Sequence, residues 1–119
     1  MPATKVLILD GEIDFHLSME VAASLRAIIA KKPRRVIVDL AKVTYLDSSG
    51  LAVLVNGMQN TKEYGGEFLL AAMQENLRPI FEIACLDQVF KIFPNVRSAR
   101  AARNPLTRSR SQFLKRKFS

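Results

Sequence analysis

One stretch decides the fold of this chain: Val36-Ile37-Val38-Asp39-Leu40-Ala41-Lys42-Val43-Thr44-Tyr45-Leu46-Asp47-Ser48-Ser49-Gly50-Leu51. It begins as an apolar, β-branched run over residues 36–40, which is typical of a buried strand. It ends in Asp-Ser-Ser-Gly at residues 47–50, and an apolar pattern of helical period follows at once. Because Asp and Ser oxygens accept the free N–H groups of a helix's first turn, this tetrapeptide predicts a helix start. Two hydroxyls and a carboxylate are therefore expected where a strand gives way to a helix, a place at which α/β proteins often bind ligands.

Strands and helices alternate on either side of this stretch. Apolar runs predict strands at residues 5–10, 36–40, 67–72 and 89–93, the last at a sheet edge. Apolar positions spaced by three and four predict helices at residues 17–30, 50–64 and 77–85, and a fourth that begins within 98–102. Ser18 is the predicted N-cap of the first helix, and Gly65-Gly66 is expected to end the second. This order predicts a single α/β domain with parallel strands joined by right-handed crossovers.

The charges divide the chain into two parts. Its 119 residues, 49% of them hydrophobic, suit one domain with a substantial core. Residues 1–90 carry 9 Lys and Arg against 11 Asp and Glu, a net charge of −2, whereas residues 91–119 carry 9 Lys and Arg and no acid, a net charge of +9. We predict an ordered domain over residues 1–102 and a basic tail, expected to be disordered, over residues 103–119. Direct binding of nucleic acid is not expected of the mildly acidic domain.

Three interpretations of the basic tail remain open. It is a solvated end, a weak contact for an anionic membrane surface or nucleic acid, or a segment that docks on a protein partner. The membrane interpretation draws on Lys115-Arg116-Lys117 with Phe113, Leu114 and Phe118 beside them, a mixture of charge and apolar bulk. No lipidation motif supports a firm anchor.

The sequence favours a cytoplasmic protein. No run approaches the roughly 18 apolar residues that a membrane-spanning helix needs, and the N-terminus lacks the pattern of a signal peptide. The single cysteine, Cys85, suits a reducing compartment, and its place beside an apolar helix face predicts that it lies in the core.

An enzyme is not predicted. The serine turn lacks a Gly-x-Ser-x-Gly elbow, and the single histidine, His16, is expected at the surface where the first helix begins. No Cys/His cluster or Gly-rich nucleotide loop is found, so neither a metal nor a cofactor is expected. Glu12 and Asp14 form an acid/base pair, a solvated turn, or part of a surface shared with the serine turn, since the carboxyl ends of adjacent parallel strands meet at one sheet edge.

The serine turn itself has two interpretations. Asp47 and the serines are helix caps and nothing more, as in many proteins. Alternatively, a serine is phosphorylated under regulation, because a helix N-terminus offers N–H donors and the positive end of the helix dipole to a phosphate.

The motifs resemble the STAS domain, and more closely the bacterial anti-sigma factor antagonists within that family. The resemblance covers about residues 5–100. It is carried by Gly11-Glu12-Ile13-Asp14, by the strand at residues 36–40, and by Tyr45-Leu46-Asp47-Ser48-Ser49-Gly50-Leu51. Gly65-Gly66 before a strand and the spacing of Leu77, Phe81 and Leu86 agree with it. The family usually has a further strand before the first one predicted here, and the basic tail is not a family feature.

The resemblance implies a small mixed sheet of about four or five strands with helices packed mainly on one face. It implies that an anti-sigma factor, itself an ATP-dependent serine kinase, phosphorylates Ser49, with Ser48 as the second choice. The unphosphorylated antagonist binds that kinase and releases the sigma factor, and a PP2C-type phosphatase reverses the modification. Asp14, Asp47, Ser48, Ser49 and Gly50 are implied to form the partner-binding surface. The alternative is a non-switching STAS subunit of a membrane-associated complex, for example one that transports lipids.

Overall fold

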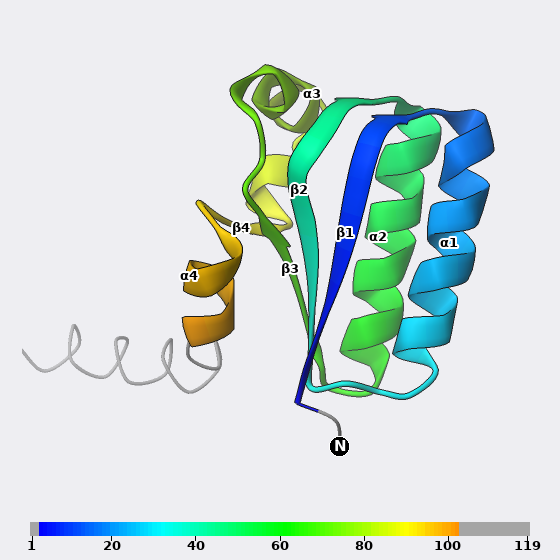
Figure 1. Cartoon of the computed structure of the whole chain (residues 1–119), viewed down its shortest axis with the longest axis vertical. Coiled ribbons are helices and arrows are strands. Elements are labelled where there is room, and N and C mark those ends of the chain that lie inside the picture. The colour runs from blue at the N-terminus through cyan, green and yellow to red at the C-terminus, as the bar shows by residue number, and fades with distance from the viewer. Residues whose placement is uncertain (1–2, 103–119) are drawn as a thin grey trace, which may run out of the picture.

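A four-stranded sheet organises residues 3–102, the part of the chain that the computed structural model describes (Figure 1). The strands lie in the order β1 (Thr4–Ile13), β2 (Arg35–Leu46), β3 (Glu67–Ala71) and β4 (Lys91–Phe93), and every neighbouring pair is parallel. The alternation of strands and helices predicted this parallel pairing. The mixed sheet implied by the resemblance is not found within residues 3–102, because each connection returns the chain to the same end of the sheet. The predicted tail, residues 103–119, lies outside the described residues.

The long helices cover one face of the sheet. Helices α1 (Phe15–Ile29) and α2 (Ser48–Glu63) lie side by side on it, which confirms the prediction that helices pack mainly on one face (Figure 1). The core between these helices and the sheet is aliphatic and aromatic: Leu9, Ile13, Val21, Leu25, Val36, Val38, Leu40, Val43, Leu46, Leu54, Met58, Phe68, Leu70, Leu77, Phe81 and Phe90. No helix in the described part of the chain is both long enough and apolar enough to cross a bilayer.

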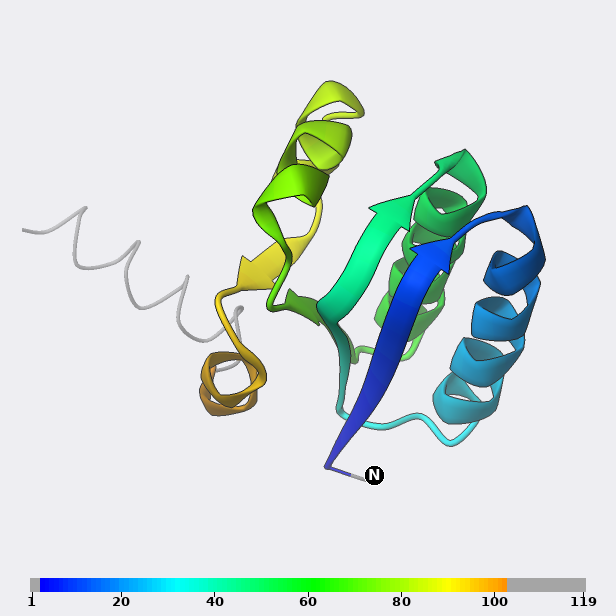
Figure 2. The same cartoon turned by 45° about the horizontal axis from the view of Figure 1, so that its top comes forward.

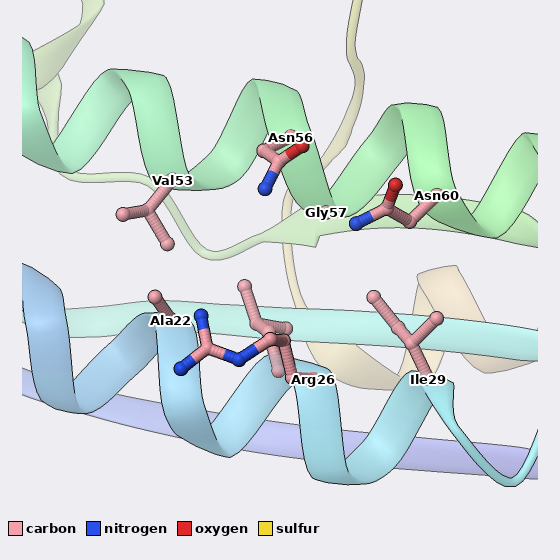
Figure 3. A pocket seen from close by; sticks show the side chains of 8 residues that line it. Ala22, Arg26, Ile29, Val53, Asn56, Gly57 and Asn60 are labelled. Atoms are coloured by element: carbon pink, nitrogen blue, oxygen red, sulfur yellow. The ribbon is translucent and has the colours of Figure 1, made fainter.

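Gly57 allows α1 and α2 to approach each other closely. A Cβ at this position would lie 3.0 Å from Phe68 Cε2 and 3.2 Å from Leu25 Cδ1. The shallow groove that remains between the two helices has a cavity volume of about 10 Å³ and is lined by side chains that include Arg26 and Asn60 (Figure 3). A space of that size holds one water molecule, whereas ligand pockets measure about 300–1,000 Å³.

The opposite face carries only the short helix α4 (Val96–Ala101), seen on the far side of the sheet from α1 and α2 in Figure 2. Ala99 packs there against Ile37, Leu69 and Ala71. Buried Arg35 fixes the end of α4, because its guanidinium donates to the carbonyl oxygens of Ala99, Arg100 and Ala102 at 3.1, 2.8 and 2.6 Å. The same group donates to Glu67 Oε1 at 2.7 Å. A cation at the carboxyl end of a helix is favourable, and Arg35 therefore joins α4 to the base of the sheet.

The first strand and helix differ from their predicted limits. β1 does not end at Asp10, because the pairing with β2 continues past Gly11, which takes φ +83°, through two register shifts. α1 begins at Phe15 and is capped by Asp14, so the prediction of Ser18 as N-cap was wrong. The Ser18 hydroxyl donates instead to Phe15 O at 2.8 Å. β2 likewise extends to Leu46, since the longer β1 pairs with it throughout.

The third helix is shorter than its apolar spacing predicts. A 3-10 turn (η1, Glu75–Leu77) precedes α3 (Arg78–Ile83), and a second turn (η2, Leu86–Gln88) follows it. Cys85 lies between α3 and η2, where it takes φ +59°. It is exposed, so its predicted place in the core was wrong. A left-handed residue ends the helix, and the helical spacing that pointed Cys85 inward stops with it.

Candidate functional site

The ends of β1 and β2 lie together at one edge of the sheet. Ile13 pairs with Leu46 as the last pair of the two strands, and the next residue of each strand is an aspartate, Asp14 or Asp47. Asp47 N–H donates to Ile13 O at 3.3 Å and ties the two turns to each other. The helices α1 and α2 therefore begin side by side at the same end of the sheet (Figure 1).

Each aspartate caps the helix that follows it. Asp47 Oδ1 accepts from Gly50 N–H at 3.1 Å, and Asp14 Oδ1 accepts from Leu17 N–H at 3.0 Å. The two residues have nearly the same backbone conformation, with φ −92° and ψ −175° at Asp47 and φ −91° and ψ −172° at Asp14. The capping interpretation is thus confirmed for Asp47. Asp14, which was not predicted as a cap, caps α1 in the same way, and capping holds each carboxylate at a fixed place on this edge.

The two serines occupy the first turn of α2. Ser48 is exposed and Ser49 is half-buried. No hydrogen bond joins either hydroxyl to another group of residues 3–102. The backbone N–H groups of a helix's first turn lack partners within the helix, and the dipole there favours negative charge. A phosphate on either serine would therefore add charge where the helix tolerates it.

Gly50 allows this turn to rest on the ends of the strands. A Cβ at this position would lie 2.8 Å from Leu46 Cδ2 and 3.0 Å from Ile13 O. The second of these is a backbone atom, which cannot move aside as a flexible side chain can. Among the predicted site residues, Gly50 is therefore buried and positions the turn, whereas the exposed and half-buried ones form its surface: Asp14, Asp47, Ser48 and Ser49.

Two apolar side chains border this edge, and the sequence analysis missed them. Phe15 is 61% exposed and Met19 is 63% exposed, one turn apart at the start of α1. The ring of Phe15 meets that of His16 edge-on, with centroids 5.9 Å apart. Phe15 and Met19 are four residues apart and do not share the helix face that buries Val21 and Leu25, a pattern that could have revealed them as exposed. These two side chains add exposed apolar area beside the polar turn.

His16, Glu12 and Asp14 were also considered as chemical groups in the sequence analysis. His16 is exposed, as expected. Glu12 is exposed on β1, while the Asp14 carboxylate is engaged in capping, so the two do not form an isolated acid/base pair. Within the described residues, no three His, Cys, Asp or Glu side chains are grouped so as to hold a metal ion. The arrangement presents a capped, hydroxyl-bearing surface.

The chain belongs to the STAS domain family, whose model matches residues 2–99. It is 31% identical over 94 residues to BtrV of Bordetella bronchiseptica, whose name assigns it provisionally as an anti-sigma factor antagonist. That match covers 79% of this chain and 80% of BtrV. It is 30% identical over 82 residues to the anti-sigma-B factor antagonist of Listeria monocytogenes, covering 69% of this chain and 72% of the relative.

Solved structures share the fold. The crystal structure of an anti-sigma factor antagonist from Mycobacterium paratuberculosis superposes with a TM-score of 0.70 at 27% identity, covering 81% of each chain. The likeness to anti-sigma factor antagonists first seen in the motifs is therefore found in sequence and in structure.

Proposed function

We propose that this protein is an anti-sigma factor antagonist. Its unphosphorylated form binds an anti-sigma factor that is also a serine kinase, and the sigma factor is released. Phosphorylation at Ser49 abolishes the binding, and a PP2C-type phosphatase restores it. These partners act in the cytoplasm, to which the proposal assigns the chain. The chain contributes a binding surface and a phosphate acceptor, and the kinase contributes the chemistry.

The observation that carries the proposal is the α2 turn at the shared edge of β1 and β2. Hydroxyls that make no hydrogen bond within residues 3–102 lie at a helix N-terminus capped by Asp47, and the turn that Asp14 caps begins at the same sheet edge. A phosphate adds about −1.5 to −2 charges at neutral pH. Beside Asp14 and Asp47 this charge would repel a partner surface adapted to a neutral hydroxyl. Ser49 is preferred to Ser48 because of its position in the Asp-Ser-Ser-Gly-Leu motif.

The same features support a switch that leaves the fold intact. Negative charge in the first turn of a helix is stabilising by about 0.3–1 kcal/mol, so phosphorylation need not unwind α2. The buried Gly50 holds the turn against Leu46 and Ile13 in either state. The change in affinity then arises from charge at the surface.

Incubation with ATP and the anti-sigma factor kinase of the source organism tests the proposal. We expect one phosphate, mapped by fragmentation mass spectrometry to Ser49. The Ser48→Ala variant should be modified as the native chain is, and the Ser49→Ala variant should not. Absence of phosphate on both serines would overturn the phosphorylation switch. Stable association with components of a membrane assembly, unchanged by Ser49→Asp, would favour the non-switching STAS subunit instead.

A further inference from the structure

The face of the sheet opposite α1 and α2 is covered unevenly. α4 packs over β2, β3 and β4, where Ile37, Leu69 and Ala71 are fully buried. The part of this face on β1 is formed by alternate residues of the strand, which we call the β1 strip: Thr4, Val6, Ile8, Asp10 and Glu12. Ile8 in its centre is 60% exposed. Figures 1 and 2 both show α4 displaced from β1 toward β4.

The β1 strip is acidic as well as apolar. Asp10 and Glu12 are exposed, and half-buried Asp39 lies beside Ile8 in the register of β1 and β2. One cation, Lys42, pairs with Asp10 in the same register. The exposed Tyr45 pairs with Glu12 and extends the apolar surface. The face therefore suits a segment that carries both positive charge and apolar side chains.

The chain itself provides such a segment, and it starts at the base of the strip. Ala102, the last described residue, is held by Arg35 at 2.6 Å, and Arg35 pairs with Thr4 at the start of the strip. The 17 residues that follow, 103–119, include 6 Lys and Arg and no acid, with Leu106, Phe113, Leu114 and Phe118 among them. The positive charge of this segment is opposite to the negative charge of the strip, and its apolar side chains can pack on those of the strip.

An unsatisfied acceptor lies at the same place. Glu67 Oε2 is buried and finds no donor among residues 3–102, although the other carboxylate oxygen is paired with Arg35. A buried acceptor without a donor costs about 1–3 kcal/mol. Arg103 follows Ala102 in the sequence and carries both a backbone N–H and a guanidinium, the kinds of donor that this acceptor needs.

The length of the segment fits. The strip runs from Thr4 to Glu12, eight residue-to-residue steps, and so spans about 26 Å at about 3.3 Å per residue. Seventeen residues reach about 25 Å as a helix and up to about 56 Å when extended. Either conformation can run the length of the strip.

We propose that residues 103–119 fold back over the β1 strip of their own chain, with apolar side chains on Val6 and Ile8 and cations beside Asp10, Glu12 and Asp39. The occupant is an intramolecular segment, whose high effective concentration favours it over a free partner. The strip ends at Glu12, two residues before Asp14, so the docked segment reaches the edge that carries the serine turn. The inference is independent of the proposed function.

Paramagnetic relaxation in the full-length chain tests this docking. A spin label on Ser111→Cys, in a Cys85→Ser background, should remove most of the amide signal of residues 5–12 in a dilute, isotopically labelled sample. The amides on the outer face of α1 should keep theirs. Ile8→Lys should restore the signals of residues 5–12, whereas Ile83→Lys, at a side chain 85% exposed on α3, should not. The isosteric pair Asp10→Asn and Glu12→Gln avoids any fold defect of Ile8→Lys and should weaken the broadening.

Three results would overturn the proposal. Broadening that is absent, or unchanged by both sets of strip variants, would exclude docking on the strip. Broadening that appears only when labelled and spin-labelled chains are mixed would assign the segment to a second copy. Tail signals that respond to vesicles containing phosphatidylglycerol, with no effect on residues 5–12 in their absence, would assign it to a membrane surface.

Discussion

The two helix starts at the sheet edge have nearly the same geometry and different surfaces. Asp14 and Asp47 follow paired strand residues, adopt matching backbone angles and cap their helices at 3.0 and 3.1 Å. The turn of α1 then presents Phe15 and His16 to solvent, whereas the turn of α2 presents Ser48 and Ser49. At the next position, α1 has half-buried Leu17 and α2 has buried Gly50.

The comparison separates what the fold requires from what the function uses. Capping is common to both turns, so an Asp at a helix start does not by itself mark a site. Hydroxyls at the first two helical positions and a glycine at the third are found in the α2 turn alone of these two. We infer that the α2 turn carries the switch and that the α1 turn contributes apolar and acidic surface beside it.

The largest expected effect comes from placing an acid at equivalent positions of the two turns. Ser49→Glu should weaken binding of the anti-sigma factor kinase by about 100-fold or more, since like charges brought together at an interface cost several kcal/mol. His16→Glu adds the same charge to the second residue of α1. Its fold-loss of affinity should be less than a tenth of the loss caused by Ser49→Glu. Equal losses in calorimetric titrations would show that charge anywhere on this edge suffices.

The close approach at Gly50 gives the next largest effect. Gly50→Val should lower the free energy of unfolding by about 1–3 kcal/mol, because the valine side chain must fit between the Leu46 side chain and the Ile13 carbonyl oxygen. Leu17→Val, at the corresponding position of α1, should cost less, since it removes volume at a half-buried site. Urea denaturation measures both. A Gly50→Val chain as stable as the native one would mean that the turn does not rest on the strand ends.

Removing the caps should affect both helices alike. Asp14→Ala and Asp47→Ala should each cost about 1 kcal/mol of stability, because each leaves one first-turn N–H without its acceptor. The two variants should differ in kinase binding, with Asp47→Ala showing the greater change. If the free energies of unfolding of the two variants differed by more than about 1.5 kcal/mol, which is the spread of measured N-cap energies, the two caps would not be equivalent despite their matched geometry.

The smallest effect lies at the far end of α2 and provides a baseline for changes in the fold alone. The Tyr64 hydroxyl donates to Pro33 O at 2.7 Å, and burial raises the pKa of the Tyr64 phenol above 10.0. The folded state therefore favours the neutral phenol. The contribution of Tyr64 to the free energy of unfolding is fully present below pH 10 and is lost as pH rises through the raised pKa. Tyr64→Phe should cost about 0.5–1 kcal/mol at neutral pH and flatten the alkaline loss. Kinase binding should be unchanged, and absorbance near the phenolate band in a Tyr45→Phe background reports the titration.

The sequence predicted the parts of this molecule that depend on neighbouring residues. The order of strands and helices followed from apolar spacing, and the helix start at residues 47–50 followed from its capping residues. Asp14 was missed as a cap because Gly11 suggests the end of a strand, and the bulge that continues β1 depends on its pairing with β2. The continuous helix expected through Cys85 failed for a similar reason, since a left-handed residue interrupts the apolar spacing.

Long-range contacts could not be predicted in this way. Nothing in the local sequence predicts that Arg35 is buried, because its partners Glu67 and the carbonyls of α4 lie more than 30 residues away. At the site, local chemistry predicted the turn, and parallel pairing made a place beside it one of three interpretations for Asp14. The choice of Ser49 and the nature of its partner came from the resemblance to a family, because no local physical feature distinguishes one acceptor serine from its neighbour.

The central claim is that charge on Ser49 switches the binding of one partner. The most direct measurement is the affinity of the anti-sigma factor kinase for two full-length chains that differ only in phosphoserine incorporated at position 49. We predict that the unphosphorylated chain binds and that the phosphorylated one binds at least about 100-fold more weakly, with the same melting curve or a slightly more stable one. Equal affinities for the two chains would contradict the account.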